Sequence, residues 1–584
     1  MAKRLGFRVC RPPELPAECA PGSMPVLGNG SCVPQGLECP EYDAWHDEAT
    51  IRRRAAGFDG KVVYVSPAGH EDGEGTRESP FGSIEDAADW AEDGDILALS
   101  KGTFSAEIFL QDEFALVGAC EAQTLLTVAS LDDSDAVVNV DVLGPVTLSD
   151  LRISGGTRGI GVLATRLLRV VGVSLHQTTG AALWISPVEQ SVEVSLEDVV
   201  ISDTQPDAES GLGVGVEINA GGLVTMRRTV VERSQHGAVY VDGKRSILRA
   251  VDSVIRRTQS TDASDIASWA VMVTGGGRVE LDRVWVGDNE DLGVYVDGEH
   301  SELVLTDVVI ANTAPASDGA GLARGLSMHG GARAVAEHLL VDSNRGLAVL
   351  VSGAGTSARM DGLAVLGTRS QPGIASAGRG MQVQQGARVE ASRALFHRNR
   401  DVGVLATGPG TVLELSDFAV SDTRPREAGV GRGRALEVST GASGTIFRGI
   451  LRNNREAGLA VLGAEATASV RDLRVRATRE SPCPSASCPP PGGSGIVVSD
   501  GALLELEDFE VSGSDLAGLQ LAGAGGLRAR SGVLRQNRIG FSGPEAGAPE
   551  PGTVRAVAND LGREPGNLPL PSSSDSIEFT TSAE

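Results

Sequence analysis

The chain contains 584 residues, of which 41% are hydrophobic and 4% aromatic, and it carries a formal net charge of −26 at pH 7. Such an acidic chain lacks the basic face with which nucleic-acid-binding proteins contact phosphates, so we exclude that class. The hydrophobic fraction is too high for an intrinsically disordered chain, and no apolar run of about 18 residues is present that could span a membrane. The composition indicates a folded protein with a large core.

Residues 1–60 form a Cys- and Pro-rich leader without strand or helix periodicity. Four of the seven cysteines lie there: Cys10, Cys19, Cys32 and Cys39. Because such a segment cannot build a core, we expect disulfides to order it, and the lack of a C-x2-C pair makes zinc the weaker alternative. Cys120 is a candidate partner for the leader, and Cys483 and Cys488 are spaced to close a small loop.

Disulfides indicate an oxidising compartment, and therefore export to the extracellular space or the outer cell surface. The first residues do not provide a complete export signal, because Cys10 comes before an apolar segment can follow the charged Met1–Arg4. We expect the natural start to lie upstream, with the export signal missing from this sequence.

Residues 61–145 are expected to begin a stack of coils. A strand at Val62–Val65 leads to the acidic loop 70–74, which is a weak candidate for Ca²⁺ and is better interpreted as a solvated loop; no cofactor is expected. Ser83 is placed to cap a helix of about ten residues that ends near Asp93–Gly94. Strands at 96–99 and 108–110 follow, and the helix would shield the first coil from edge pairing.

Residues 146–540 repeat with a period of 55 residues, and each repeat contains a long and a short coil. One column, spaced by 54, 55, 55, 55 and 55 residues, consists of Thr204, Thr258, Thr313, Thr368, Thr423 and Thr478. Between them stand Ser234, Asn289, Asn344, Asn399 and Asn454. Apolar columns keep the same register at Leu326/Met381/Leu436 and Met328/Val383/Val438. Short strands in stacked coils predict an all-β fold, a right-handed parallel β-helix of roughly 17 coils. Residues 541–584 are expected to form a cap and a disordered tail.

A second column lies six residues before the first and alternates in charge. It consists of Asp198, Arg228, Asp252, Arg283, Asp307, His338, Gly362, Arg393, Asp417, Arg448 and Asp472. We expect exposed ion pairs between coils, and the exchange of Asp for Gly362 indicates a left-handed backbone turn rather than catalysis. The Thr/Asn column is expected to be a hydrogen-bonded ladder between coils.

The beginning of the stack resembles bacterial pectin-lyase-like β-helix proteins. The matching residues are Ser66-Pro67, Gly75-Thr76, Pro80-Phe81, Ser83-Ile84, Gly94-Asp95 and Gly102-Thr103-Phe104. The resemblance implies the pectin-lyase fold and, with the Cys-rich leader, an exported and often lipid-anchored protein. Such proteins include lyases, epimerases, hydrolases, adhesins and many of unknown activity, so the fold does not decide the function.

The sequence does not contain a recognisable catalytic set of that group. A lyase-like calcium site, the paired Asp residues of polygalacturonase-like hydrolases and an epimerase-like D-P-H-D motif are all missing from the sequence. Whether the protein is an enzyme stays open, and the absence of these motifs favours a binding protein.

Two surfaces are candidates for ligand binding. Trp184, Tyr240 and Tyr295 occupy similar coil positions and would form an aromatic stripe if they point outward; packing without a ligand is the alternative. The loops that follow the Thr column are expected to form a row, with Arg424, Arg426, Arg432 and Arg434 in the fifth loop; solvated variation is the alternative.

We therefore predict a monomeric β-helix scaffold that binds an extended ligand such as a polysaccharide, or another surface protein. A polysaccharide lyase or related uronate-acting enzyme, and a purely structural spacer, are the alternatives.

Overall fold

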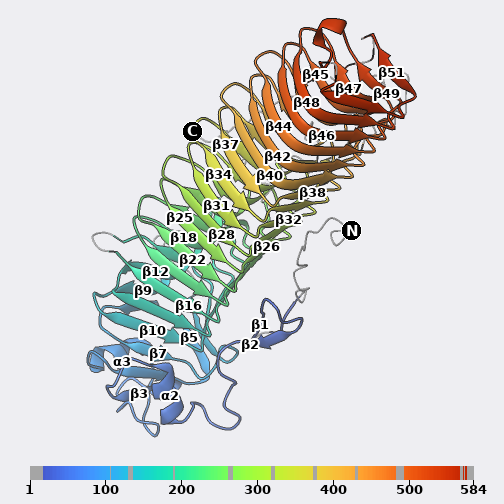
Figure 1. The fold of residues 1–584 in the computed structure, drawn as a ribbon. Helices are drawn as coiled ribbons and strands as arrows, with labels where there is room; N and C mark the ends of the chain where they lie inside the picture. Colours follow the sequence, from blue (N-terminus) through green and yellow to red (C-terminus); the bar gives the residue numbers. More distant parts are fainter. Residues whose placement is uncertain are drawn as a thin grey trace. The chain divides into compact units, whose positions relative to one another are not determined.

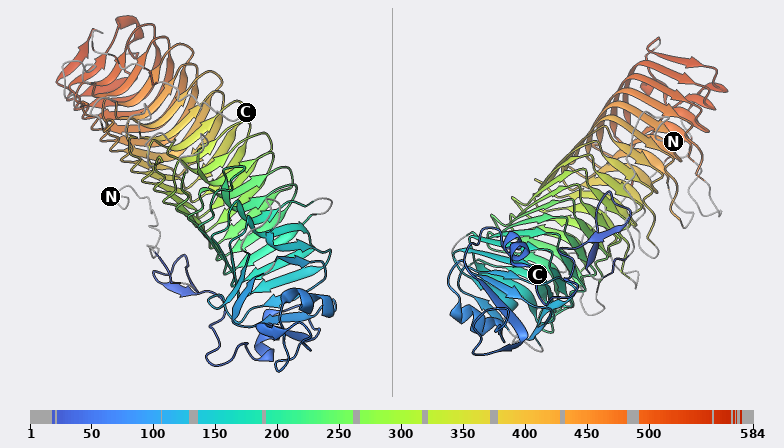
Figure 2. Two further views of the ribbon diagram at one scale, coloured as in Figure 1. Left: turned by 180° about the vertical axis from the view of Figure 1, so that it is seen from behind. Right: turned by 90° about the horizontal axis from the view of Figure 1, so that it is seen from below.

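The computed structural model describes residues 18–20, 22–105, 107–128, 136–187, 191–260, 267–316, 322–371, 378–427, 432–481, 492–550, 552–565, 568, 570 and 573–574. The chain forms two compact units. The N-terminal unit comprises Arg11–Glu290 with His300–Leu303, and the C-terminal unit comprises Asp291–Glu299 with Val304–Glu584. Each unit is a right-handed parallel β-helix, as the repeat predicts (Figures 1 and 2).

The coils of the N-terminal unit build three parallel ladders. Ladder 1 consists of β6 (Ile108–Leu110), β9 (Ala136–Asp141), β12 (Arg158–Ala164), β15 (Ala181–Ile185), β18 (Gly213–Ile218), β21 (His236–Asp242) and β24 (Trp269–Thr274). Ladder 2 consists of β3 (Val62–His70), β4 (Ile96–Leu99), β7 (Ala115–Val117), β10 (Pro145–Ser149), β13 (Leu167–Val171), β16 (Glu193–Glu197), β19 (Leu223–Arg227), β22 (Ile247–Val251) and β25 (Arg278–Asp282). Ladder 3 consists of β5 (Gly102–Ser105), β8 (Thr124–Thr127), β11 (Arg152–Ser154), β14 (Ser174–His176), β17 (Val200–Ser202), β20 (Val230–Glu232), β23 (Val254–Arg256) and β26 (Trp285–Gly287).

The C-terminal unit has the same three ladders. Ladder 1 consists of β27 (Leu292–Val296), β30 (Arg324–Met328), β33 (Leu347–Ser352), β36 (Arg379–Gln384), β39 (Val402–Thr407), β41 (Arg434–Ser439), β43 (Ala457–Leu462), β45 (Ser494–Ser499), β47 (Ala517–Leu521), β49 (Ile539–Ser542) and β51 (Leu561–Glu564). The first strands of ladders 2 and 3 are β28 (Glu302–Thr306), β29 (Val309–Ala311), β31 (Arg333–Glu337), β32 (Leu340–Asp342), β34 (Ser357–Asp361), β35 (Ala364–Leu366), β37 (Arg388–Ser392) and β38 (Leu395–His397). Long strands then run through both ladders: β40 (Val412–Ser421), β42 (Ser443–Arg452), β44 (Thr467–Arg476), β46 (Leu503–Ser512), β48 (Gly526–Arg535) and, in part, β50 (Val554–Val557).

The interior of each unit is filled by the apolar side chains that alternate along these strands. The six residues of the predicted columns at Leu326 and Met328 are all 0% exposed. Strands this short bury enough apolar surface only when they are stacked, because each coil covers the next. The ladders continue past residue 540, since β50 and β51 pair with β48 and β49.

Both predicted corner columns are present. Asn399 is 1% exposed, and its Oδ1 accepts hydrogen bonds from the Thr368 N–H (3.1 Å) and Oγ1 (2.8 Å), while its Nδ2 donates to the Val365 carbonyl (3.2 Å). Asn344 and Asn454 make the same two backbone contacts, whereas the Thr313 and Thr423 hydroxyls have no hydrogen-bond partner among the described residues. At these three corners the column therefore supplies partners for buried backbone groups, and the expected side-chain hydrogen bond is present between Thr368 and Asn399.

The charged column has the left-handed backbone that the exchange with glycine predicts. Its eleven members all have φ between 45° and 75°. Gly362 has no side-chain charge with which Arg393 could pair. Arg393 instead contacts Asp361, the residue before Gly362.

Two short helices lie at the N-terminal end of the N-terminal unit (Figure 1). The predicted capping helix is α3 (Ile84–Trp90), where the Ser83 hydroxyl accepts from the Asp86 N–H at 3.0 Å; it ends earlier than the expected Asp93–Gly94. A second helix, α2 (Glu48–Arg54), was not predicted from the sequence; Asp47 is its N-cap. Its apolar side packs on the outer face of β3, β4 and β7.

Disulfides order the leader, as predicted. Cys19 pairs with Cys32 across the hairpin of β1 (Ser23–Pro25) and β2 (Cys32–Pro34), and Cys39 pairs with Cys120 of the β-helix. Cys10 and the pair Cys483 and Cys488 lie outside the described residues.

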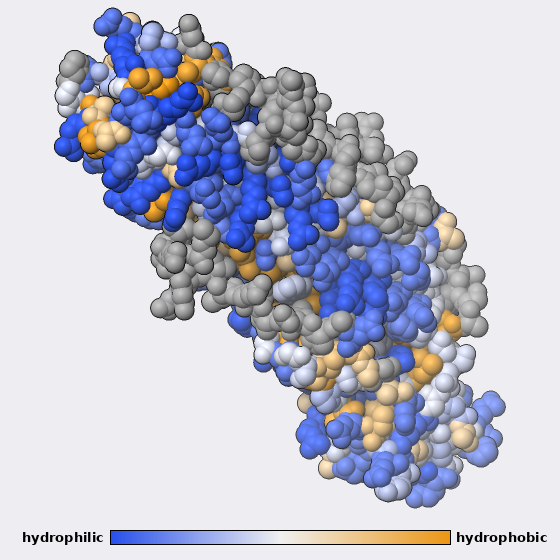
Figure 3. Space-filling view, turned by 90° about the vertical axis from the view of Figure 1, so that its right-hand side faces the viewer, coloured by the Kyte–Doolittle hydropathy of each residue, from blue (hydrophilic) through white to orange (hydrophobic). Residues whose placement is uncertain are grey.

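Neither described helix is long and apolar enough to cross a membrane. Hydrophilic side chains dominate the described part of the face shown in Figure 3 and surround small apolar patches.

Candidate functional site

The outer face of ladder 1 in the N-terminal unit presents one continuous column of side chains. The register pairs its members in consecutive coils: Phe109, Asn139, Gly161, Trp184, Glu217, Tyr240 and Met272. Their strand neighbours on either side are buried in the core, so this column points outward. We call it the aromatic column. It places Trp184 and Tyr240 together as the sequence predicts, about 10 Å apart over two coil spacings.

Trp184 is half-buried, and the Arg158 guanidinium lies 4.0 Å from its ring centroid. A cation over an indole face holds the ring in one orientation. The guanidinium therefore covers one face of the indole and holds the ring in place at the outside of the coil.

Hydrogen-bonding groups surround Tyr240 in the neighbouring coils. Glu217 accepts from the Asn219 side chain at 2.7 Å, and Thr274 donates to Asp242 at 2.7 Å. Burial raises the pKa of Tyr240. A hydrogen bond with Thr274 lowers this pKa in part, and the negative charges of Asp242 and Glu217 raise it further. The phenol therefore stays protonated at neutral pH and can donate as well as accept.

Phe109 belongs to the same column and was missed by the sequence analysis. It is 56% exposed, between the buried Ile108 and Leu110. Its exposure could have been predicted from the strand Ile108-Phe109-Leu110. Side chains alternate along a strand, so when Ile108 and Leu110 face the core, Phe109 faces solvent.

Tyr295 occupies the same strand position in the C-terminal unit but is not an exposed platform. It is 6% exposed and stacks on His329, with ring centroids 5.5 Å apart. The His329 Nε2 is 2.8 Å from the Ser327 Oγ. Burial lowers the pKa of His329 to about 3, with a contribution from Arg324, so the imidazole is neutral at physiological pH. The expected exposed stripe is therefore restricted to the N-terminal unit.

Arg324 is buried beside this cluster. Burial lowers its pKa to about 10, and burial also raises the pKa of Tyr295, with Asp297 adding to the rise. The arginine remains cationic at neutral pH. Arg324 and Ser327 lie on β30, His329 directly follows that strand, and Tyr295 comes from its neighbour β27.

The four arginines of the fifth loop do not form an exposed patch. Arg424 is exposed, whereas Arg426 lies 3.1 Å from the Asp401 carboxylate and is 29% exposed. Arg432 donates to the Ser573 carbonyl at 2.8 Å. Arg434 begins β41 and is fully buried, so its expected place in an exposed loop was wrong.

Arg434 is buried because two carboxylates neutralise it. Its Nη1 lies 2.6 Å from Glu437 and its Nε 2.9 Å from Glu456. Arg379, 55 residues earlier, makes the corresponding pair with Asp401 at 2.9 Å. Charge-assisted pairs of this kind satisfy buried guanidinium groups, so these arginines stabilise the outer face of ladder 1.

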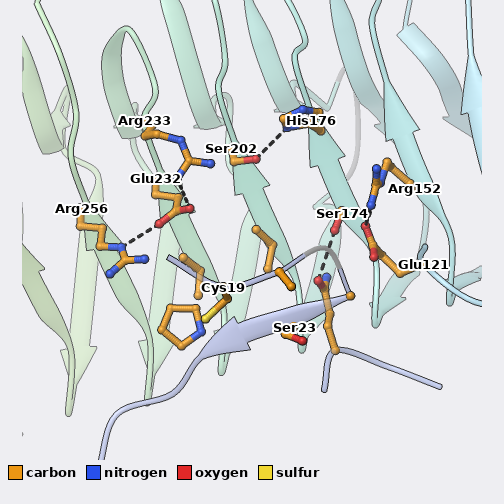
Figure 4. Close-up of a pocket in the computed structure, with 16 residues that line it drawn as sticks. Cys19, Ser23, Glu121, Arg152, Ser174, His176, Ser202, Glu232, Arg233 and Arg256 are labelled. Atoms are coloured by element: carbon orange, nitrogen blue, oxygen red, sulfur yellow. Dashed lines mark hydrogen bonds and ion pairs between the residues drawn. The ribbon is translucent and has the colours of Figure 1, made fainter. Parts of the chain in front are cut away.

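A separate cavity of about 160 Å³ lies between the leader and ladder 3 of the N-terminal unit (Figure 4). It is lined by Cys19, Ala20, Gly22, Ser23, Pro25, Gln35, Glu121, Arg152, Ser174, His176, Val200, Ser202, Val230, Glu232, Arg233 and Arg256.

The polar groups of this cavity largely contact one another. Glu232 bridges Arg233 and Arg256, and Glu121 is paired with Arg152 at 2.7 Å. The volume corresponds to about five water molecules at ~30 Å³ each, and the lining includes three arginines and two glutamates. The leader docks beside it through Met24, which packs on Val230 and Val254. We interpret the cavity as a hydrated part of the leader interface.

Within the described ranges, no three His, Cys, Asp or Glu side chains are grouped closely enough to hold a metal ion.

No family model matches the sequence, and no curated protein matches it. Solved structures with a similar fold include the pectate lyase Pel9A, at 12% identity over 74% of this chain and 83% of that chain, with a TM-score of 0.25. The catalytic unit of a GH87 α-1,3-glucanase from Streptomyces thermodiastaticus is 10% identical over 91% and 73%, with a TM-score of 0.27. The A-module of the Azotobacter vinelandii mannuronan C-5 epimerase AlgE6 is 12% identical over 82% and 93%, with a TM-score of 0.19.

Proposed function

We propose that the N-terminal unit binds a neutral polysaccharide chain along the aromatic column. The observation that carries the proposal is the outward register of Trp184 and Tyr240, with Glu217 in the coil between them. Aromatic rings stack on the apolar faces of pyranose rings, and carboxylates between them accept hydrogen bonds from sugar hydroxyls.

The column has the geometry that an extended ligand requires. Consecutive coils are spaced by about 4.8 Å, so successive sugars of a chain parallel to the ladder would meet successive coils. Phe109 lies three coils before Trp184, at about 14 Å, and extends the column toward the N-terminal end of the unit. The ligand would therefore contact several coils at once.

The carboxylates beside Tyr240 favour a neutral chain over a polyuronate, whereas Arg158 beside Trp184 is cationic. Glu217 and Asp242 flank Tyr240, and Asp141 is exposed at the end of β9. The net charge of −26 would repel a polyanion at long range. The fifth loop offers little compensation because Arg434 is internal and Arg426 is paired.

In this proposal the protein is exported from the cytoplasm. The two disulfides are compatible with an extracellular location, where a polysaccharide ligand would be encountered.

Binding can be tested with soluble neutral and acidic polysaccharides by calorimetry and affinity electrophoresis. Trp184→Ala and Tyr240→Ala should each weaken binding of a neutral chain by about 5- to 30-fold, corresponding to about 1–2 kcal/mol per lost platform. Tyr42→Ala is the control, because Tyr42 is 89% exposed in the leader, outside ladder 1. Equal losses in all three variants, or no binding of any polysaccharide, would reject the aromatic column as the site.

The cluster around Tyr295 favours a second candidate, a uronate-acting lyase in the C-terminal unit. His329 would be the base that accepts the C5 proton of a uronate, although a pKa of about 3 makes its neutral imidazole a weak base, and the Arg324 cation would stabilise the charge that develops on the carboxylate. The electrons of the broken C–H bond form the C4–C5 double bond and expel the O4 leaving group, which takes a proton from the Tyr295 hydroxyl.

Elimination creates an unsaturated chain end that absorbs ultraviolet light. A panel of uronate polysaccharides, with and without Ca²⁺, would show a protein-dependent rise in absorbance if this candidate is correct, and His329→Gln should abolish it. A flat trace across the panel would eliminate the lyase.

A further inference from the structure

Ser574 is inserted into the outer face of ladder 1 in the C-terminal unit. Its backbone N–H donates to the Glu437 Oε1 at 2.7 Å, and its hydroxyl donates to the Glu437 Oε2 at 2.6 Å. Ser574 is 3% exposed, although the preceding Ser573 is exposed. The two residues lie 137 positions apart in sequence, so this is a tertiary contact.

Glu437 is a buried hydrogen-bond acceptor at this position. It is 0% exposed and occupies the outward position of β41, between Leu405 and Ala460 of the neighbouring coils. Arg434 holds the carboxylate through its Oε2. A buried carboxylate is stable only when its oxygens receive donors, and Ser574 supplies one to each oxygen.

Arg432 completes the contact on the other side of the segment. It donates to the Ser573 carbonyl at 2.8 Å, while Glu437 accepts from the Ser574 N–H of the same peptide group. The site therefore contacts a backbone C=O, a backbone N–H and a serine hydroxyl. That combination of acceptor and donors belongs to a peptide and is not reproduced by a sugar hydroxyl alone.

We propose that Arg432, Arg434 and Glu437 form a peptide-binding site whose resident occupant is the chain's own Ser573–Ser574 segment. The site is separate from the aromatic column, which belongs to the N-terminal unit. The same site accepts a serine-containing peptide of this sequence from a second molecule when its own segment is released.

Hydrogen exchange in the full chain tests the docked state. The Ser574 amide should exchange at least about tenfold more slowly than in the free peptide, because its acceptor is charged and buried. Glu437→Gln should remove most of that protection, and the coil amides of β41 and β43 should stay protected if the fold is intact. Glu414→Gln is the matched control, since Glu414 is a carboxylate of the same unit paired with Arg388 at the surface. An unprotected Ser574 amide in the unaltered chain would overturn the proposal.

Binding from a second molecule is measured with the synthetic peptide of residues 571–578 and a chain that ends at Leu570. The peptide should bind the shortened chain and compete at least about tenfold less well for the full-length chain. A peptide with Ser574→Ala, or the shortened chain with Glu437→Gln, should bind at least about tenfold more weakly. Equal binding by the altered and unaltered peptides would show that the serine contacts do not define a site. Because none of these measurements involves a polysaccharide, the outcome is independent of the proposed function.

Discussion

The guanidinium of Arg228 reaches back one coil to the carboxylate of Asp198, with Nε–Oδ1 and Nη2–Oδ2 distances of 2.7 Å, and both residues have positive φ, 45° and 55°. The two side chains are 29% and 25% exposed, so water screens part of their attraction. The position thus combines a backbone requirement with a moderate ion pair. The pair orders neighbouring coils, whereas the backbone turn forms the bend between ladders 2 and 3.

Asp417 separates these two contributions. It has a φ of 52° and pairs with Arg448 at 2.6 Å. Asp417→Gly should lower the free energy of unfolding of the C-terminal unit by at most about 1 kcal/mol, because glycine adopts the turn freely and only an exposed pair is lost. Asp417→Ala should cost about 1–2 kcal/mol, since it adds left-handed strain. Urea denaturation compares the two variants; a larger loss for glycine would contradict the backbone argument.

Asn399 tests the buried corner ladder. Asn399→Ala removes the acceptor of the Thr368 N–H and leaves that group and the Val365 carbonyl without their side-chain partner. We expect a loss of about 2–4 kcal/mol in unfolding free energy, from orphaned groups of about 1–3 kcal/mol each. Asn399→Thr, which introduces the residue found at the alternate corners, should cost less. Equal stability of the alanine variant and the unaltered protein would contradict a structural role for the ladder.

The two disulfides should differ in how strongly they stabilise the N-terminal unit. Cys39 and Cys120 are separated by 81 residues, whereas Cys19 and Cys32 are separated by 13. By loop-closure entropy, replacing Cys39 and Cys120 by serine should cost about 4.5 kcal/mol, and replacing Cys19 and Cys32 about 3 kcal/mol. Chemical denaturation of both double variants under non-reducing conditions measures the difference. The reverse order would show that the hairpin disulfide Cys19–Cys32, rather than the Cys39–Cys120 link to the β-helix, governs the stability of the leader.

The stability of the N-terminal unit should fall as the pH drops from about 6.5 to about 4 because of His236. It is 0% exposed against Trp269, with ring centroids 4.6 Å apart, and burial lowers its pKa to about 4. In this interval the unfolded chain binds a proton that the folded unit does not, so acid favours unfolding by up to about 3 kcal/mol.

His236→Asn should flatten this pH dependence, and asparagine tolerates the φ of 109° at this position. Denaturation curves at several pH values measure the slope, and NMR titration of the imidazole reports its pKa. An imidazole that titrates near 6.5 in the folded protein would contradict the burial argument.

Much of the coil architecture was predictable because repetition displays local requirements many times. The spacing of 55 residues placed Asn399 in the Thr/Asn column and Asp417 in the charged column. The structure confirms the hydrogen bond at Asn399 and the positive φ at Asp417. The strands at 96–99 and 108–110 were predicted at their observed bounds. By contrast, α2 lies outside the repeat and was missed, because a single helix of 7 residues provides no second copy for comparison.

The candidate site was predictable only in part. The shared coil position of Trp184 and Tyr240 was visible in the sequence, and the strand register follows from it. Whether a side chain on that outer face is exposed depends on what covers the ladder, and this is not a local property. The same position therefore gives a half-exposed ring at Tyr240 and a buried one at Tyr295.

The sequence by itself determined the period, the inward columns, the corner residues and the coil type, because these depend on alternation and backbone conformation within each repeat. Only the tertiary structure decided that Arg434 is an internal ion-pair partner, that Cys39 joins Cys120, and that Ser574 docks on Glu437. Those contacts join residues far apart along the chain. Their formation is governed by burial and charge compensation between segments, and the local periodicity of the sequence contains no information about these contacts.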